Sequence, residues 1–273
     1  MTVRATGSAV GFDIYEDAQV RVVSDKRVSA AEGRTLARRV ERAFKWDERK
    51  EKWRDPASLK PQVTVNVLSK DAFTRFTGDS TGSIAGVTTG PDVFVVPDRV
   101  LRGVSANDET TMAHELAHIQ DFREGGAALE QVPIYLQEGK AYVLGDQYPA
   151  SLGLRDGHLA SVSRTLGQLT AHDAQTVLTH FRAARDEQGS PQFTYYGEVT
   201  GALFVEWLRT HQKSDAVPRL AQAIADSGRG AGFQSSFRTQ FGFSLDTAEQ
   251  AFVRYVGDTE GNPAERLKGT IYA

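Results

Sequence analysis

The 273-residue chain contains no cysteine. This absence excludes disulfide bonds, zinc sites built from thiolates and catalysis by a thiol nucleophile. The chain also lacks a run of about eighteen apolar residues, so we expect no membrane-spanning helix. Neither basic nor acidic residues are in large excess. The formal net charge is -3, which argues against nucleic acid or an anionic membrane as the main partner.

The N-terminal sequence MTVRATGSAVGFD has no apolar segment of the kind found in signal peptides. The compartment is not fixed by the sequence, and an exported or cell-envelope protein whose leader has been removed is favoured over a cytoplasmic one. The oligomeric state is not fixed either. The length is sufficient to bury a full core, so we expect one domain or two tightly packed lobes.

One short motif stands out, the sequence HELAH at residues 114–118. Two histidines four residues apart lie on one face of a helix, so His114 and His118 can bind the same tetrahedral zinc ion. Glu115 lies beside the first histidine, where its carboxylate can act as general base on a water molecule at that metal. We expect Asn107 or Asp108 to cap this helix and residues 125–126 to end it.

Glu138 is the candidate for a third ligand. Nineteen residues separate it from His118, enough for the chain to reverse and return on a second helix. Gly139 has no side chain, so two helices can approach closely beside the ligand. Two histidines and one glutamate leave one zinc position free, which is typical of a catalytic site. We therefore expect one zinc ion per chain, bound by His114, His118 and Glu138.

HELAH followed by YLQEGKAY resembles the gluzincin metallopeptidases. The spacing is similar to that of thermolysin, and the second motif is similar to that of the peptidase MA-like families. The resemblance covers roughly residues 63–208 in the order of elements, and only the two motifs are specific. It implies hydrolysis of a peptide or protein substrate, with His114, His118 and Glu138 as zinc ligands and Glu115 as base.

The resemblance also implies an α+β, zincin-like fold. Residues 1–125 would form an N-terminal α/β lobe with a small mixed sheet, ending in the HExxH helix. Residues 126–273 would form a mainly helical lobe that carries the third ligand, with the active-site cleft between the lobes. No Gly-x-Met-Glu-Asn motif is present. In related aminopeptidases that motif captures an N-terminal amine, so we expect an endopeptidase or a narrow specificity.

Gluzincins that resemble this chain place a tyrosine on a late helix, where its hydroxyl can donate to the oxyanion of the tetrahedral intermediate. Tyr195 and Tyr196 are the candidates here. Both lie further from the following Phe-Val-x-x-Leu run than the resemblance requires, and Glu198 occupies the nearer place. The alternative is that the two rings pack between helices.

The same resemblance places an edge strand above the active-site helix, where it pairs with an extended substrate. Residues 84–89 are the expected strand, so Ala85, Gly86 and Val87 are the candidate substrate-binding residues. Gly86 would let a substrate backbone come close. The alternative is an ordinary hairpin with a glycine bulge.

A metal-bound histidine usually donates its second N–H to a carboxylate or a carbonyl. Thermolysin-like enzymes keep an aspartate four residues after the glutamate ligand, but this chain has Tyr142 there. Asp146, one turn further on, is our candidate instead.

Two other readings remain open. The chain could be a peptidase-like module that binds peptides or a partner without turnover, or a helical protein in which HExxH arose by chance.

A separate alternative concerns residues 29–54, where basic residues form either a polyanion-binding face or a solvated one. Interleaved acidic residues favour the solvated face.

Hydrophobic periodicity places the remaining elements. We expect strands at 20–23, 63–68, 84–89 and 92–96, a capped helix at 29–50 that begins with a Ser29/Glu32 capping box, and a short helix at 69–76. From residue 106 onward the chain is expected to be almost wholly helical, at 107–124, 129–146, 158–168, 171–186, 195–211, 216–227 and 244–257.

Overall fold

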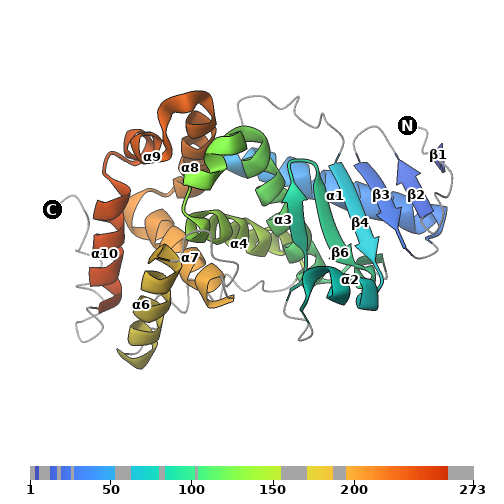
Figure 1. Ribbon diagram of the computed structural model, residues 1–273, viewed down its shortest axis with the longest axis horizontal. Helices are drawn as coiled ribbons and strands as arrows, with labels where there is room; N and C mark the ends of the chain where they lie inside the picture. The colour runs from blue at the N-terminus through green and yellow to red at the C-terminus, as the bar shows by residue number, and fades with distance from the viewer. Residues whose placement is uncertain are drawn as a thin grey trace.

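The computed structural model describes residues 4–5, 13–16, 20–25, 28–52, 63–79, 84–101, 104–154, 171–186 and 195–257. Within these residues the fold is α+β, with all strands in the first part of the chain (Figure 1). The strands are β1 (Arg4–Ala5), β2 (Asp13–Glu16), β3 (Val20–Ser24), β4 (Val63–Leu68), β5 (Val87–Gly90) and β6 (Val93–Pro97).

Helices α1 (Ala30–Glu51) and α2 (Lys70–Thr77) lie between strands in the sequence, and the later helices follow the sheet. No described helix combines the length and hydrophobicity that a bilayer span requires. The later helices are α3 (Ala106–Gly125), α4 (Ile134–Ser151), α6 (Ala171–Asp186), α7 (Tyr195–Trp207), α8 (Ala216–Asp226), α9 (Phe233–Phe241) and α10 (Leu245–Gly257), with short helical turns at Asp98–Leu101, Gly126–Gln131, Leu208–Gln212 and Ser227–Ala231.

The strands form one mixed sheet in the order β1-β2-β3-β4-β6-β5. β3, β4 and β6 run parallel to one another, whereas β1, β2 and β5 each pair antiparallel with their neighbours. This confirms the small mixed sheet expected from the sequence. It also makes β5 an edge strand, because β6 is its only strand neighbour in the described sheet.

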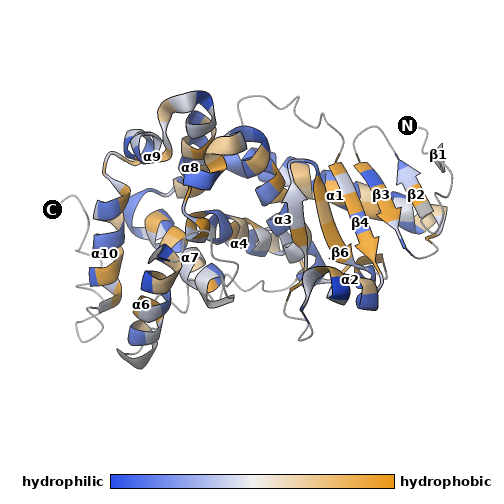
Figure 2. Cartoon of the chain, in the orientation of Figure 1, coloured by the Kyte–Doolittle hydropathy of each residue, from blue (hydrophilic) through white to orange (hydrophobic). Residues whose placement is uncertain are grey.

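The sheet buries one face against helices. In β4 the residues alternate between buried and partly exposed, as expected for a strand covered mainly on one side. Val65 pairs with Val22 of β3 and with Phe94 of β6, so that three fully buried side chains form a row across the sheet. Figure 2 shows the apolar strands β3, β4 and β6 side by side.

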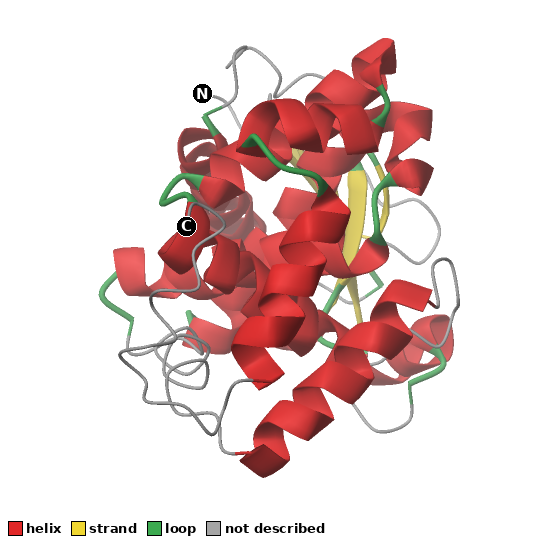
Figure 3. Cartoon of the chain, turned by 90° about the vertical axis from the view of Figure 1, so that its left-hand side faces the viewer, coloured by secondary structure: helices red, strands yellow, loops and turns green. Residues whose placement is uncertain are grey.

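Helix α3 lies between the sheet and the helical part of the chain (Figure 1). It contacts β5 and β6 on one side and packs along α4 on the other. Seen from the helical side, the helices lie in front of the strands (Figure 3). One hydrophobic core includes residues of the sheet, of α1 and of the later helices. The position of α3 therefore joins the part that carries the sheet to the part that carries Glu138.

Most element boundaries agree with the sequence predictions, including the Ser29/Glu32 capping box of α1. The predicted cap of α3 was wrong: Ser105 is the N-cap, and its hydroxyl accepts a hydrogen bond from the Asp108 backbone. The predicted start of α4 at residue 129 was wrong too. Pro133 restricts the residue before it to extended conformations, and Val132 has φ -84° and ψ 124°, so α4 begins only at Ile134.

Two further differences concern β5 and α9. Strand pairing of β5 begins at Val87, so Ala85 and Gly86 precede the strand rather than lie within it. Helix α9 was not predicted, although Phe233, Phe237 and Phe241 recur every four residues and are all buried. The helix expected at 158–168 lies outside the described residues.

Candidate metal centre

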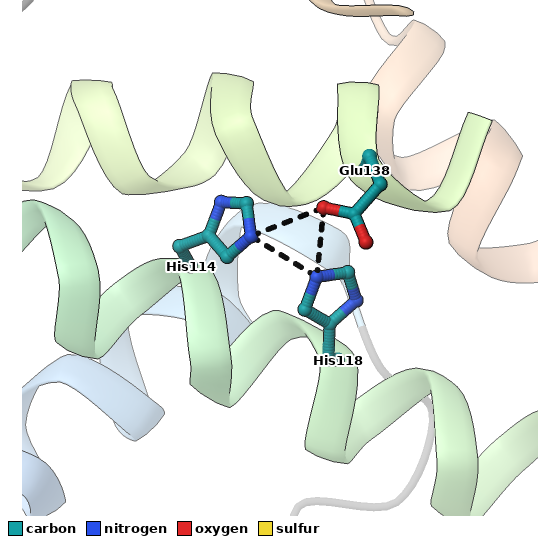
Figure 4. A group of neighbouring side chains, drawn as sticks. All are labelled: His114, His118 and Glu138. Carbon is teal, nitrogen blue, oxygen red and sulfur yellow. Dashed lines mark hydrogen bonds and ion pairs between the residues drawn. The ribbon is translucent and has the colours of Figure 1, made fainter. Parts of the chain in front are cut away.

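Two helices bring the three predicted ligands together. His114 and His118 lie one turn apart on α3, and Glu138 lies on the adjoining face of α4 (Figure 4). The two histidine Nε2 atoms are 3.1 Å apart. Each lies 3.3 Å from Oε2 of Glu138, so the three atoms form a nearly equilateral triangle. The sequence prediction that these residues meet at one point is confirmed.

The triangle has the size that a tetrahedral zinc ion requires. Zinc binds imidazole nitrogen and carboxylate oxygen at about 2.0–2.2 Å, and tetrahedral geometry then places neighbouring ligand atoms about 3.3–3.5 Å apart. The two separations of 3.3 Å lie at the lower end of that range and the third, 3.1 Å, lies just below it, so a small outward shift of the histidine side chains admits the ion. Two nitrogens and one oxygen also suit other first-row transition metals, so the geometry defines a metal site and not a particular metal.

The ligands are partly buried and electrostatically coupled. Their side chains are 12–18% exposed, so a substrate group or a water molecule can reach them. Burial lowers the pKa of His118, but the Glu138 carboxylate outweighs that effect and raises the pKa to about 9. Burial alone would raise the pKa of Glu138, yet the facing histidines hold it well below its usual range. A metal ion bound here would take the place of the proton on His118.

Glu115 lies beside the triangle and is 5% exposed. Its Oε2 accepts a hydrogen bond of 2.8 Å from the Thr88 hydroxyl of β5, which also lies 2.9 Å from the Glu115 backbone oxygen. The sequence analysis did not single out Thr88. A signal was present, because Thr88 and Gly86 are two residues apart and so share one face of an extended segment.

Close helix packing holds Glu138 in place. A Cβ atom built on Gly139 would lie 2.4 Å from the backbone of Gly201 in α7, too close for any side chain. On the α3 side of α4, a Cβ atom built on Gly145 would lie 3.1 Å from Cβ of His114. The prediction that Gly139 lets two helices approach is therefore confirmed, and the second helix is α7.

A buried charge cluster lies behind the ligands. Lys140 of α4 is fully buried, and its Nζ is 2.8 Å from Oδ1 of Asp121, which follows His118 by three residues on α3. Lys140 also pairs with the buried carboxylate of Glu51 at the end of α1. Burial lowers the pKa of Lys140, but the two carboxylates outweigh it and keep the lysine charged. One ammonium group thus connects α1, α3 and α4, and the last two of these carry the candidate ligands.

Two further carboxylates, those of Asp146 and Glu198, were considered as neighbours of the ligands. The prediction that Asp146 orients a ligand histidine was wrong, because neither of its oxygens has a hydrogen-bond partner among the described residues. Burial, together with the charge of Glu206 on α7, raises the Asp146 pKa to about 7. Glu198 of α7 does lie near the ligands. Burial raises its pKa to about 7, and Glu138 adds to the rise.

The remaining predicted site residues are only partly described. α7 begins at Tyr195, and the side chains of Tyr195 and Tyr196 lie outside the described part of the structure, so their oxyanion role stays a prediction. Ala85, Gly86 and Val87 lead into the edge strand β5, which packs against α3. A Cβ atom built on Gly86 would lie 2.8 Å from Oε1 of Glu115. These residues therefore lie next to the candidate base, and substrate binding by them stays a prediction.

Two basic residues of α1 form ion pairs with described residues. Lys45 pairs with Glu41 one turn earlier, and Arg39 forms a buried ion pair with Glu109 of α3 at 2.7 Å. For Lys45 this contact fits the alternative that the basic residues form a solvated helix face. Arg39 instead contributes to the packing of α1 against α3.

No protein-family model matches this chain, and a comparison with curated proteins gives no match either.

Proposed function

We propose that the protein is a zinc-dependent metallopeptidase of gluzincin type with a zincin-like fold. The observation that carries the proposal is the triangle formed by the ligand atoms of His114, His118 and Glu138, with Glu115 next to it. Two histidines and one glutamate around one zinc ion leave a coordination position open for chemistry. A structural zinc site, by contrast, normally has four protein ligands.

Each residue of the site has one role in peptide-bond hydrolysis. Bound zinc supplies Lewis-acid chemistry, since it polarises a carbonyl group and lowers the pKa of water. His114, His118 and Glu138 hold the ion. Glu115 takes a proton from the attacking water and delivers it to the leaving amine, as a general base and then a general acid. The substrate is a peptide or protein, cleaved within the chain, and the edge strand β5, which pairs on one side only in the described sheet, would pair with an extended substrate.

The experiment compares wild type with Glu115→Gln at matched zinc content. The amide keeps the size of the side chain and cannot accept a proton. We expect one zinc per chain in both proteins, hydrolysis of a labelled unstructured protein by wild type, and a loss of at least about 10³-fold in the variant. Glu130→Gln, at an exposed position after α3, is the matched control and should retain full activity.

Three results would contradict the proposal. Zinc content near zero that added zinc does not restore would exclude the metal site. Equal rates for zinc-loaded wild type and Glu115→Gln would show that Glu115 is not the base. Zinc binding without hydrolysis by wild type would identify a binding module.

A further inference from the structure

The side chain of Glu115 is held by one hydrogen bond from a neighbouring strand. Its Oε2 lies 2.8 Å from Oγ1 of Thr88, and Thr88 is its only hydrogen-bond donor among the described residues. The two residues are 27 positions apart and belong to β5 and α3. The contact therefore links the edge of the sheet to the helix that carries two of the ligands.

The Thr88 hydroxyl has a choice of two acceptors, Oε2 of Glu115 at 2.8 Å and the backbone oxygen of Glu115 at 2.9 Å. A hydroxyl group has a single hydrogen to donate. A carboxylate oxygen forms the stronger bond because it is charged, and the backbone oxygen lies in the middle of α3, where the helix already supplies a donor. We conclude that the hydrogen points mainly to the carboxylate.

Gly86 determines where the other carboxylate oxygen can lie. A Cβ atom built at position 86 would be 2.8 Å from Oε1 and 2.9 Å from Cγ of Glu115. It would also be 2.8 Å from the Thr111 methyl group, one turn earlier on α3. Real Cβ atoms do not approach this closely, so a side chain here would push Glu115 from its position. Gly86 leaves space for Oε1, and Thr88 binds Oε2.

We propose that Thr88 is a positioning residue for the general base, assisted by the space that Gly86 leaves. The inference rests on the proposed peptidase function, since it assigns a role within that reaction. Thr88 acts through Glu115 and does not touch the substrate. By fixing Oε2, the hydroxyl sets the direction in which Oε1 accepts and returns the proton. Misplacing a catalytic group by about 1 Å can cost about 10²-fold in rate.

The test uses the zinc-loaded full chain and three variants. Thr88→Val removes the hydroxyl at nearly constant shape, and Thr88→Ser keeps it. Thr89→Val changes the exposed neighbour, whose hydroxyl donates to the Val93 backbone oxygen at 3.3 Å and not to Glu115. We expect Thr88→Val to lower kcat about 10- to 100-fold with KM and zinc content unchanged. Thr88→Ser should restore most of the rate, and Thr89→Val should match wild type.

A second readout does not depend on hydrolysis. Urea unfolding of the metal-free protein is compared for wild type, Thr88→Val, Glu115→Ala and the double variant. We expect the single effects on the unfolding equilibrium constant to be non-additive by at least about tenfold, which corresponds to the contribution of one hydrogen bond to a charged group.

The outcomes separate this inference from the proposed function. If wild type hydrolyses the substrate and Thr88→Val keeps its kcat, the positioning role is wrong and the peptidase stands. Additive unfolding effects would also overturn the inference, because the contact would then carry no energy. If wild type shows no hydrolysis, the peptidase proposal fails, and the positioning role fails with it even where the two residues are coupled.

Discussion

At the scale of single residues, the metal site depends on one negative charge. Glu138 is the only anionic ligand of the triangle, and it faces both histidines through the same oxygen (Figure 4). A neutral amide at this position would leave the charge of a divalent cation less compensated. The charge of Glu138 therefore contributes to affinity as well as to geometry.

We expect Glu138→Gln to lower zinc affinity by at least about 100-fold, since residues that merely orient ligands are already worth about 10- to 100-fold. The fold should be kept. Competition with a chromophoric chelator measures the affinity, and Glu130→Gln is again the matched control. If Glu138→Gln binds zinc as tightly as wild type, the third ligand lies elsewhere.

The sequence was sufficient to predict that His114 and His118 face one point, because helical spacing places them on one face of α3 without knowledge of the fold. It was not sufficient to predict Thr88. That contact joins residues 27 positions apart on a strand and a helix, so it depends on how β5 packs against α3. Asp146 shows the opposite error, because a contact was predicted that does not form. Its spacing from Glu138 suggested a partner for a ligand histidine, but both of its carboxylate oxygens lack a hydrogen-bond partner among the described residues.

At the scale of elements, α4 is held between α3 and α7 at glycine positions. At the α7 side, the backbones of Gly139 and Gly201 are in contact, and Cβ atoms at either position would collide with backbone atoms that cannot move aside. Glu138 precedes Gly139 directly. A shift of α4 at this contact would therefore also move the third ligand.

We predict that Gly139→Ala lowers the free energy of unfolding by at least about 1–3 kcal/mol through overpacking and also weakens zinc binding. Gly257→Ala, at the end of α10, is the control, because a Cβ atom there meets no neighbour within 4 Å. That change should be neutral or slightly stabilising, since alanine favours the helix. Urea unfolding checks both, and an unchanged midpoint for Gly139→Ala would contradict the close packing.

The second connection between elements is the buried Lys140. Lys140→Met would leave Asp121 and Glu51 as buried carboxylates without their ammonium partner. We expect a loss of about 3–5 kcal/mol in the free energy of unfolding. Lys45→Met removes an exposed pair within one helix and should cost at most about 0.5 kcal/mol. Equal stability of Lys140→Met and wild type would mean that the charge cluster does not hold the three helices together.

Some helix boundaries were predicted from local signals, and others were missed although a local signal was present. Serine and glutamate at the start of α1 form the capping box that their spacing indicates. The late start of α4 follows from Pro133, a local signal that the periodicity of the apolar residues had obscured. Helix α9 follows a glycine-rich turn, and its three buried phenylalanines were the missed evidence.

At the scale of the whole molecule, the α+β class and the mixed sheet could be predicted from periodicity and the order of elements. The single core that joins sheet and helices could not, because it depends on side chains that meet only after folding. The same holds for buried charge. The sequence suggested Asp146 as a partner of a ligand histidine but did not indicate its burial, and in the fold it is 1% exposed.

This burial predicts a pH dependence of stability. Burial, reinforced by Glu206, raises the Asp146 pKa from 3.8 to about 7, so the folded chain keeps a proton that the unfolded chain loses near pH 4. The resulting stabilisation is present below about pH 4 and is lost as the pH rises through 7. Asp146→Asn removes this loss. Its stability relative to wild type should therefore increase between pH 5 and pH 8 in urea unfolding of metal-free protein.

Asp71→Asn, at an exposed position of α2, controls for the substitution itself. A difference between Asp146→Asn and wild type that stays constant from pH 5 to pH 8 would show that Asp146 titrates alike in both states.

The placement of all three ligands on two consecutive helices has a consequence for folding kinetics. Only nineteen residues separate His118 from Glu138, whereas β3, β4 and β6 must close longer loops to pair in parallel. Contacts between residues close in sequence form early, because little chain entropy is lost. Zinc can therefore bind the α3–α4 hairpin before the sheet is complete. In stopped-flow experiments we expect zinc to accelerate refolding more than it slows unfolding, and the Glu138→Gln variant to lose that acceleration.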